Sequence, residues 1–384
     1  NGTWVGPTVD KTNYMALTDL WTGRDDNTTQ INWQALYDAN HSNNVVNPNG
    51  SAKYIIERRH NDLFELPMTL NYQGQVLKHM KLTAGLETKI AEGRHYKTVD
   101  DLLGANQWID VDPFSERDLK ELSGNVDMAQ SDIESVKQNN MRNPNKAVGK
   151  GDVFGYNYNI FMTNVAAFLQ NEWRWNCVDL FYAFKLTYNS FQRNGMMQNG
   201  RADYLARVYT NDFMSKNPTA DKAEVSRYYA DLYKSYGAGR THRFLDPSGK
   251  AGVAYHINGR NHLKAHVLAE TRAPYARDAY ISVRNHDRTI GNLQSQQTLS
   301  YDLSYEWNYP IFRGRITGYR THMLKGSELN GYYDDSYNTF VNYAMTGLNQ
   351  INQGIEVGAS VNLGLYFTLS AAASVSDHHY TKDA

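Results

Sequence analysis

Three histidines in one part of the chain have the spacing that could support chemistry. His262 and His266 are four residues apart, with His256 a short distance before them. On an extended strand, side chains alternate between the two faces, so His262 and His266 lie on the same face. Imidazoles gathered in this way can hold a metal ion or a haem. A polar strand face lining the interior of a barrel would contain the same residues, and the sequence favours that second interpretation. We therefore expect neither a metal nor a cofactor.

No catalytic motif in the sequence indicates an enzyme. The sequence contains no HExxH, no GxSxG, no Walker A loop and no EF-hand loop. Each of these motifs places specific ligands, nucleophiles or phosphate-binding amides at fixed spacing. We expect no catalytic residues and a protein that is not an enzyme.

Tyrosines form a second group with useful chemistry, since the chain contains 28 of them and is 12% aromatic. Their flat, amphipathic rings suit sugars, peptides and siderophores equally well. Two regions expected to be loops combine such rings with carboxylates. The candidate ligand-binding residues are Tyr228, Tyr229, Tyr233, Tyr236, Tyr332, Tyr333, Asp334 and Asp335.

Charge and hydropathy exclude several classes of protein. The 39 Lys and Arg residues almost balance 40 Asp and Glu, which gives no electrostatic footprint for nucleic acid. One cysteine, Cys177, excludes an intrachain disulfide and a multi-cysteine zinc site. The longest apolar runs have five residues, such as 165–169, whereas a membrane-spanning helix needs roughly 20. Nucleic-acid binding and a helical membrane protein are therefore not expected.

Alternation of apolar and polar residues identifies the elements that must position these side chains. Apolar residues occupy odd positions in 299–309 and even positions in 178–188, and 64–72 and 355–363 show the same period. Each pattern extends over about ten residues, the length of a tilted membrane-spanning strand. Soluble strands are usually nearer 5–6 residues. We expect the apolar positions of 299–309 and 178–188 to face lipid.

The strands come in pairs. We expect five hairpins, formed by 63–73 with 79–95, 153–170 with 177–193, 241–257 with 262–271, 295–308 with 312–325, and 351–363 with 366–380. Within each hairpin the turn is short. Between hairpins the connections 96–152, 194–240, 272–294 and 326–350 are long, and the first sixty residues also have loop character. Short turns at one end and long loops at the other are typical of outer-membrane barrels.

Two finer predictions concern local structure. Val253, Tyr255 and Ile257 must share a face with the apolar residues of 263–267, which requires an odd-residue turn with a bulge rather than a two-residue turn. Short helices are expected in the long connections, at 115–122, 128–138 and 221–236.

Several stretches resemble a known family. The first is Leu102–Trp108 followed by Arg142–Asn145, the second is Glu270–Pro274, and the third runs from Gly331–Asp335 through Phe340–Tyr343 to Gln353–Glu356. Together they resemble the barrel of TonB-dependent outer-membrane receptors of the Bacteroidetes type. The resemblance implies an all-β fold, an antiparallel transmembrane β-barrel of about 22 strands with long extracellular loops.

That resemblance also implies a function and partners. It implies a receptor in the cell outer membrane that takes up a scarce nutrient, such as a siderophore, a peptide or a glycan, through its extracellular loops. The lipid bilayer, the small nutrient, a surface lipoprotein and the TonB–ExbB–ExbD complex are the implied partners. TonB would act through a plug domain, which we do not expect to find within this chain.

The extent of the barrel and its transport mode leave alternatives open. We expect residues 1–384 to be one segment of a large barrel without its plug domain and closing strands, although a complete barrel of ten or twelve strands is the alternative. A passive porin or a structural outer-membrane barrel is the alternative function. An outer-membrane hydrolase is less favoured, because no Ser–His pair can be nominated.

Overall fold

The computed structural model describes residues 11–46, 51–115, 128–334, 339–364 and 366–382. Two compact units are present. The first contains residues 1–59, 97–110 and 145–154, and the second contains 60–96, 111–144 and 155–384.

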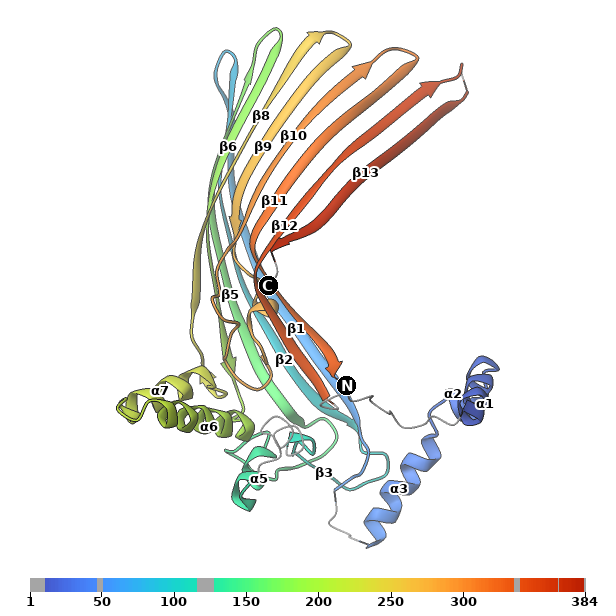
Figure 1. The fold of residues 1–384 in the computed structure, drawn as a ribbon, viewed down its shortest axis with the longest axis vertical. Helices are drawn as coiled ribbons and strands as arrows, with labels where there is room; N and C mark the ends of the chain where they lie inside the picture. Colours follow the sequence, from blue (N-terminus) through green and yellow to red (C-terminus); the bar gives the residue numbers. More distant parts are fainter. Residues whose placement is uncertain (1–10, 47–50, 116–127, 335–338, 365, 383–384) are drawn as a thin grey trace, which may run out of the picture. The chain divides into compact units, whose positions relative to one another are not determined.

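One antiparallel sheet dominates the fold (Figure 1). Its ten long strands are β1 (Ile56–Leu77), β2 (Met80–Asp101), β5 (Val153–Arg174), β6 (Val178–Gly195), β8 (His242–Asn258), β9 (Asn261–Arg272), β10 (Gln296–Asn308), β11 (Phe312–Asp334), β12 (Thr339–Asn362) and β13 (Thr368–Lys382). They lie side by side in sequence order, and the short β7 (Gly237–Ala238) pairs with β6. The five expected hairpins and the all-β fold class are confirmed.

Three of the four expected long connections are present, within 96–152, 194–240 and 272–294. Turns of a few residues close each hairpin, for example Gly259–Arg260 between β8 and β9. The connections between hairpins carry the other elements, which are β3 (Trp108–Ile109), α5 (Gln130–Val136), β4 (Ala147–Val148), α6 (Gly200–Lys216), α7 (Lys222–Leu232) and α8 (Ala276–Ala279). Helices α5 and α7 confirm two of the three expected helical segments. The third, 115–122, lies outside the described residues except for Ser115. None of the helices that the structure describes is long and apolar enough to cross a membrane.

The prediction of a loop at 326–350 is wrong. Strands β11 and β12 continue through it, pairing from Gly326↔Leu348 to Asp334↔Thr339. A register shift lies between Met323 and Gly326. Because a bulge inserts one extra residue, the side-chain period changes phase there, and the strand pattern is hidden in the sequence.

The N-terminal region is also not a loop. It contains α1 (Lys11–Thr22), α2 (Asp26–Thr29) and α3 (Trp33–Val46). The carboxylate of Asp25 accepts a hydrogen bond from Thr28 N at 3.0 Å, and Asn32 accepts one from Ala35 N at 3.0 Å. Polar residues that suggested loops are therefore helix N-caps.

The β8–β9 hairpin confirms the expected facing and the bulge. Val253 pairs with Ala265 and Tyr255 pairs with Leu263. The register then shifts between His256 and Asn258. The closing turn has two residues, so the expected odd-residue turn is wrong, because the bulge alone corrects the phase.

The two faces of the sheet differ as the alternation predicts. Phe184 is 61% exposed and Leu303 55%, whereas Ala183 and Ser304 on the other face are 9% and 5% exposed. Aliphatic and aromatic side chains that remain exposed along long strands fit a lipid-facing surface.

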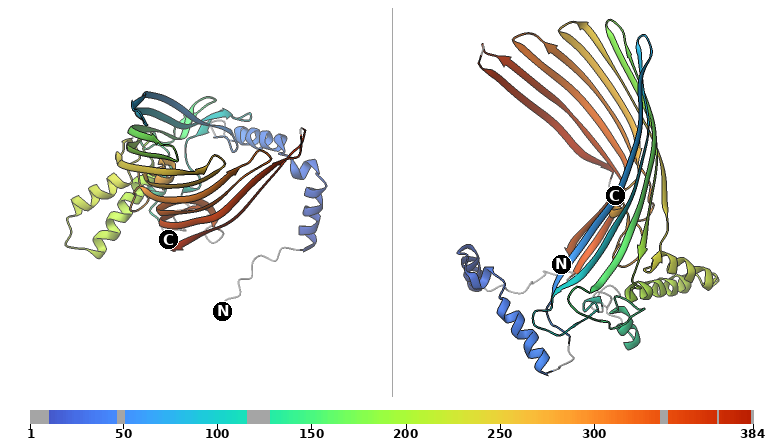
Figure 2. Two further views of the ribbon diagram at one scale, coloured as in Figure 1. Left: turned by 90° about the horizontal axis from the view of Figure 1, so that it is seen from above. Right: turned by 180° about the vertical axis from the view of Figure 1, so that it is seen from behind.

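Each unit has its own apolar cluster. In the first unit, Val99, Val148 and Phe154 pack together. In the second, Tyr158, Ile160 and Phe191 pack against Ala279 and Tyr280 of the connection 272–294, which therefore lies against the sheet. Figure 2 shows this sheet from above and from behind.

Candidate functional site

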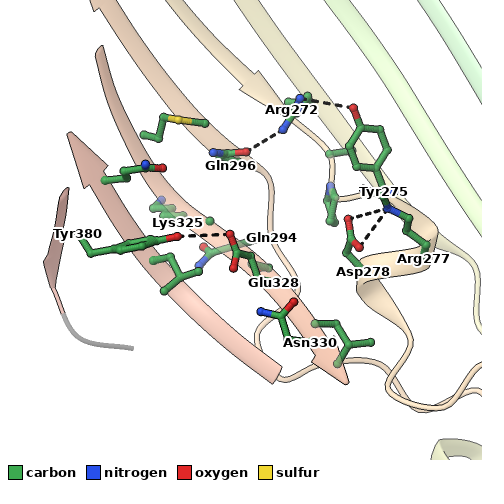
Figure 3. A pocket seen from close by; sticks show the side chains of 18 residues that line it. Arg272, Tyr275, Arg277, Asp278, Gln294, Gln296, Lys325, Glu328, Asn330 and Tyr380 are labelled. Atoms are coloured by element: carbon green, nitrogen blue, oxygen red, sulfur yellow. Dashed lines mark hydrogen bonds and ion pairs between the residues drawn. The ribbon is translucent and has the colours of Figure 1, made fainter. Parts of the chain in front are cut away.

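Antiparallel register brings polar residues from five strands to one place. Arg272 ends β9 and pairs with Gln296, the first residue of β10. Farther along the strand order, Gln350 of β12 pairs with Tyr380 of β13. Lys325 of β11 lies between these two pairs in the strand order. All five residues line a cavity of about 460 Å³ (Figure 3).

The connection after β9 builds the opposite wall of the cavity. Pro274 has no N–H for a further ladder bond, and Tyr275 precedes the single turn α8. The start of this connection is fixed, because Ala273 N donates to Asp246 Oδ2 at 3.1 Å. Asp246 is 2% exposed and also accepts a hydrogen bond from Asn189 Nδ2 at 2.9 Å. The wall is therefore anchored to the sheet.

Neutral groups orient the guanidinium of Arg272. Its Nη2 donates to Gln296 Oε1 at 3.0 Å, and its Nη1 lies 3.5 Å from the hydroxyl of Tyr275. The guanidinium carbon also lies 5.2 Å from the centroid of the Tyr275 ring. These contacts fix the direction of the side chain without neutralising its charge.

The other charged residues of the cavity have their own contacts. Arg277 Nε lies 3.3 Å from Asp278 Oδ1, which makes an ion pair on the wall. The hydroxyl of Tyr380 donates to Glu328 Oε1 at 3.4 Å. Figure 3 shows the Tyr380–Glu328 contact near Lys325 and the Arg277–Asp278 pair across the cavity from it.

Lys325 has an unusual backbone. Its φ is +58°, in the left-handed region, and it lies within the β11 register shift. Its backbone N–H donates to Asn349 Oδ1 at 3.2 Å. Bulges redirect side chains and concentrate beside functional sites, and a residue other than glycine at positive φ carries a conformational cost.

A buried polar cluster holds the two neighbouring connections together. Arg193 of β6 is 1% exposed; its Nε donates to Val283 O at 2.7 Å and its Nη1 to Ser235 O at 3.1 Å. Asp287 Oδ2 accepts from Arg240 N at 2.7 Å. Connections 194–240 and 272–294 are therefore joined through one arginine and one aspartate.

Burial shifts the ionisation of two adjacent residues in this cluster. It raises the pKa of Asp287 to about 6, against the lowering effect of the Arg240 N–H and nearby cations. Burial and neighbouring arginines lower the pKa of His286 to about 3. Both shifts favour the uncharged forms of the two side chains.

The tyrosines proposed from the sequence lie in different surroundings. Tyr228 is exposed on α7, and Tyr229 stacks on Tyr209 at 5.9 Å. Tyr233 is buried, and Tyr236 lies under the guanidinium of Arg142 at 4.4 Å.

The second proposed group lies at the far end of β11. Tyr332 and Tyr333 are exposed and paired with β12, and Asp334 ends the strand. Asp335 lies outside the described residues. None of the described candidates from either group lines the cavity.

The cavity is therefore not predictable as a site from the sequence. Its residues come from separate strands, and only the register brings them together. A partial signal was present, because Arg272 belongs to the stretch Glu270–Pro274 and Pro274 marks the end of a strand.

The three histidines form two separate sets of contacts. His256 Nδ1 lies 2.7 Å from His262 Nδ1, and His256 Nε2 lies 3.0 Å from Asp179 Oδ2. His266 Nδ1 lies 2.9 Å from Asp302 Oδ1. Over the described ranges of the chain, no group of three or more His, Cys, Asp or Glu side chains is arranged to hold a metal ion.

Comparison with known proteins gives the fold a name. No protein-family model matches the chain, and no curated protein sequence is detectably similar to it. Among solved structures, the chain is similar to the copper transporter OprC, with a TM-score of 0.55, 12% sequence identity, and coverage of 86% of this chain and 40% of that one. The fold is that of a TonB-dependent receptor barrel.

The FrpB iron transporter from Neisseria meningitidis (F3-3 variant) gives a TM-score of 0.49 at 12% identity, covering 84% of this chain and 36% of that one. The chain thus spans less than half the length of either transporter.

Proposed function

We propose that this chain is the barrel portion of a TonB-dependent receptor in the cell outer membrane that takes up a scarce small nutrient. The observation that carries the proposal is the cavity of about 460 Å³, lined by polar side chains of five strands, in a sheet with the fold of such a receptor. Small-molecule sites are concave and place a few polar groups where they fix the ligand.

The finer parts of the proposal rest on the resemblance in sequence. The receptor is of the Bacteroidetes type, and its nutrient is a siderophore, a peptide or a glycan. Energy comes from the TonB–ExbB–ExbD complex through a plug domain, and a surface lipoprotein assists capture. The exposed rings of Tyr228, Tyr236, Tyr332 and Tyr333 make the first contacts with the nutrient.

The packing of connection 272–294 favours a receptor over a passive pore. Tyr280 and Ala279 of this connection are buried against β5 and β6, and Asp246 and Arg193 fix it by hydrogen bonds. A connection anchored at several points places ligand-binding groups reproducibly. A pore that only filters by size has no need of such anchoring.

Uptake with and without TonB tests the proposal. Cells carrying the full-length receptor are given radiolabelled ferric siderophores, peptides and oligosaccharides separately, and accumulation is measured. We expect accumulation of one class that stops when TonB is deleted. Accumulation at full rate without TonB would identify a passive pore.

Exposed tyrosines provide the second arm of this test. Serine at Tyr228, Tyr236, Tyr332 and Tyr333 should reduce ligand binding at the cell surface. The amount of receptor in the outer membrane should remain unchanged, because these exposed rings contribute little to packing. A loss of receptor protein in parallel with binding would mean that the rings are structural.

A further inference from the structure

Charges around the 460 Å³ cavity are not balanced. Its lining contains three cations, Arg272, Arg277 and Lys325, and two carboxylates, Asp278 and Glu328. Asp278 is paired with Arg277 at 3.3 Å, and Glu328 accepts a hydrogen bond from Tyr380. Within the described residues, Arg272 and Lys325 have no ion-pair partner at the cavity. After the Arg277–Asp278 pair, two cations and the carboxylate of Glu328 remain, so the lining keeps a net positive charge, and Arg272 and Lys325 are its sources.

From this imbalance we propose that the cavity binds a small hydroxylated carboxylate, with the carboxylate of the ligand placed between Arg272 and Lys325. The inference deepens the proposed function and rests on it. It specifies the class of nutrient by the chemistry of the site.

The guanidinium of Arg272 is prepared for such a ligand. Gln296 accepts from Nη2, and the Tyr275 hydroxyl lies beside Nη1. A guanidinium has five N–H donors, so donors remain for the ligand after these two contacts. Arginine binds carboxylates through two parallel hydrogen bonds, and prior orientation reduces the entropy lost on binding.

Lys325 supplies the second positive charge from the neighbouring part of the sheet. The β11 bulge and the positive φ of Lys325 depart from regular strand geometry at the cavity itself. The resulting strain is accounted for if this conformation brings an ammonium group to the ligand.

Amide side chains determine the rest of the ligand. Gln294, Gln296, Asn330 and Gln350 line the cavity beside the two cations. A primary amide both donates and accepts hydrogen bonds, so it matches a hydroxyl group, which does the same. The cavity volume is within the range of small-molecule sites. The ligand is therefore compact, hydroxylated and anionic.

Two sources supply ligands of this chemistry, acidic sugars and metal chelates of hydroxycarboxylates. Binding of digalacturonate and of ferric citrate to the purified full-length receptor is measured by calorimetry, with neutral digalactose as the uncharged comparison. We expect one of the two acidic probes to bind and digalactose to bind at least tenfold more weakly, as loss of a charge-assisted contact implies.

Variants assign the binding to the two cations. Arg272→Gln and Lys325→Gln should each lower the affinity for the acidic probe by about tenfold to a hundredfold. In the unmodified receptor, this affinity should also fall with added salt. Lys264→Gln is the matched control, because Lys264 is also a β9 cation but already pairs with Glu306 at 2.6 Å. Its affinity for the probe should stay unchanged. Heat-modifiable migration shows that each variant is folded.

The results that overturn the inference differ from those that overturn the proposed function. Failure of both acidic probes to bind, equal binding of digalactose, or unchanged affinity in folded Arg272→Gln and Lys325→Gln would each reject the inference. TonB-dependent uptake of a neutral nutrient would then leave the receptor function intact. If the protein binds an acidic probe but its uptake does not depend on TonB, the receptor function is rejected and the anion-binding site is supported.

Discussion

Arg193 and Tyr280 are 87 residues apart in sequence and in direct contact, since Arg193 N donates to the Tyr280 hydroxyl at 3.1 Å. Tyr280 also belongs to the apolar cluster that contains Tyr158, Ile160 and Phe191. Burial raises the pKa of Tyr280, so its hydroxyl stays protonated. Connection 272–294 is thus attached to β6 by both a polar contact and an apolar one.

Removal of this hydroxyl should loosen the connection without opening the sheet. Tyr280→Phe leaves the buried Arg193 N–H without its partner, which should cost about 1–3 kcal/mol of local stability. Hydrogen exchange of the amides in 276–290 should become faster, while strand amides stay protected. Tyr228→Phe, which changes an exposed ring, should alter neither the exchange of 276–290 nor that of the strands. Unchanged exchange in Tyr280→Phe would mean that the hydroxyl contact contributes nothing.

Charge on the lipid face should prevent assembly. Phe184 is 61% exposed on β6, and an arginine on a lipid-facing position costs up to about 2–4 kcal/mol at the bilayer midplane. Phe184→Arg should therefore reduce the heat-modifiable receptor in the outer membrane.

Thr187→Arg is the control for the lipid-face prediction. Thr187 is on the same strand and lines a cavity of about 440 Å³ on the other face, next to Lys185. An arginine there is surrounded by polar groups and should be tolerated. Equal loss of receptor in the two variants would contradict the assignment of faces.

The adjacent residues His286 and Asp287 should make opposite contributions to pH dependence. The folded pKa of Asp287 is about 6, above its ordinary 3.8. Its contribution to the stability of the folded state therefore falls as pH rises from about 4 to 6. The folded pKa of His286 is about 3, below its ordinary 6.5, so its contribution rises as pH rises from about 3 to 6.5. In the wild type the two trends should largely cancel between pH 4 and 6.

Single substitutions should reveal each trend. With Asp287→Asn, the local stability of 276–290 should increase from pH 4 to 6, and with His286→Gln it should decrease. Hydrogen exchange corrected for the intrinsic rate at each pH provides the measurement. Parallel slopes in the two variants would exclude this assignment.

Gly239 should not accept a side chain. A Cβ at this position would lie 2.1 Å from Asp287 Oδ1. Gly239→Ala should therefore displace Asp287 from Arg240 N and expose connection 194–240 to limited proteolysis. Gly259→Ala, where a Cβ meets nothing within 4 Å, should leave the protease pattern unchanged. Resistance of Gly239→Ala to the protease would show that the contact yields without consequence.

Alternation predicted the sheet well because lipid and interior demand different side chains at successive positions. Phe184 and Ser304 lie on the faces that the period assigns to them. The alternation does not predict the structure where its period is interrupted. At Lys325 the bulge changes the phase, and at Asp25 a polar residue caps a helix rather than starting a loop.

The candidate site was less predictable than the strands. Arg272 and Gln350 are distant in sequence, and only the registers of the intervening strands bring them to one cavity. Tyr233 shows the opposite difficulty, because its ring chemistry suits a ligand while its position is buried against Tyr209 and His286. Composition indicates which side-chain types could bind a ligand. The strand pairing determines which of those residues line the cavity.

The strictly sequential order of the strands has a consequence for how the protein reaches its folded state. Each long strand after β1 pairs with the long strand that precedes it in the chain, so the sheet can grow at one advancing edge by adding hairpins as they arrive. Closing a tight turn is fast and loses little entropy. Before β13 can pair, β12 must already be in place, so a defect in an early hairpin should block every later step, whereas a defect in β13 should leave the earlier hairpins formed.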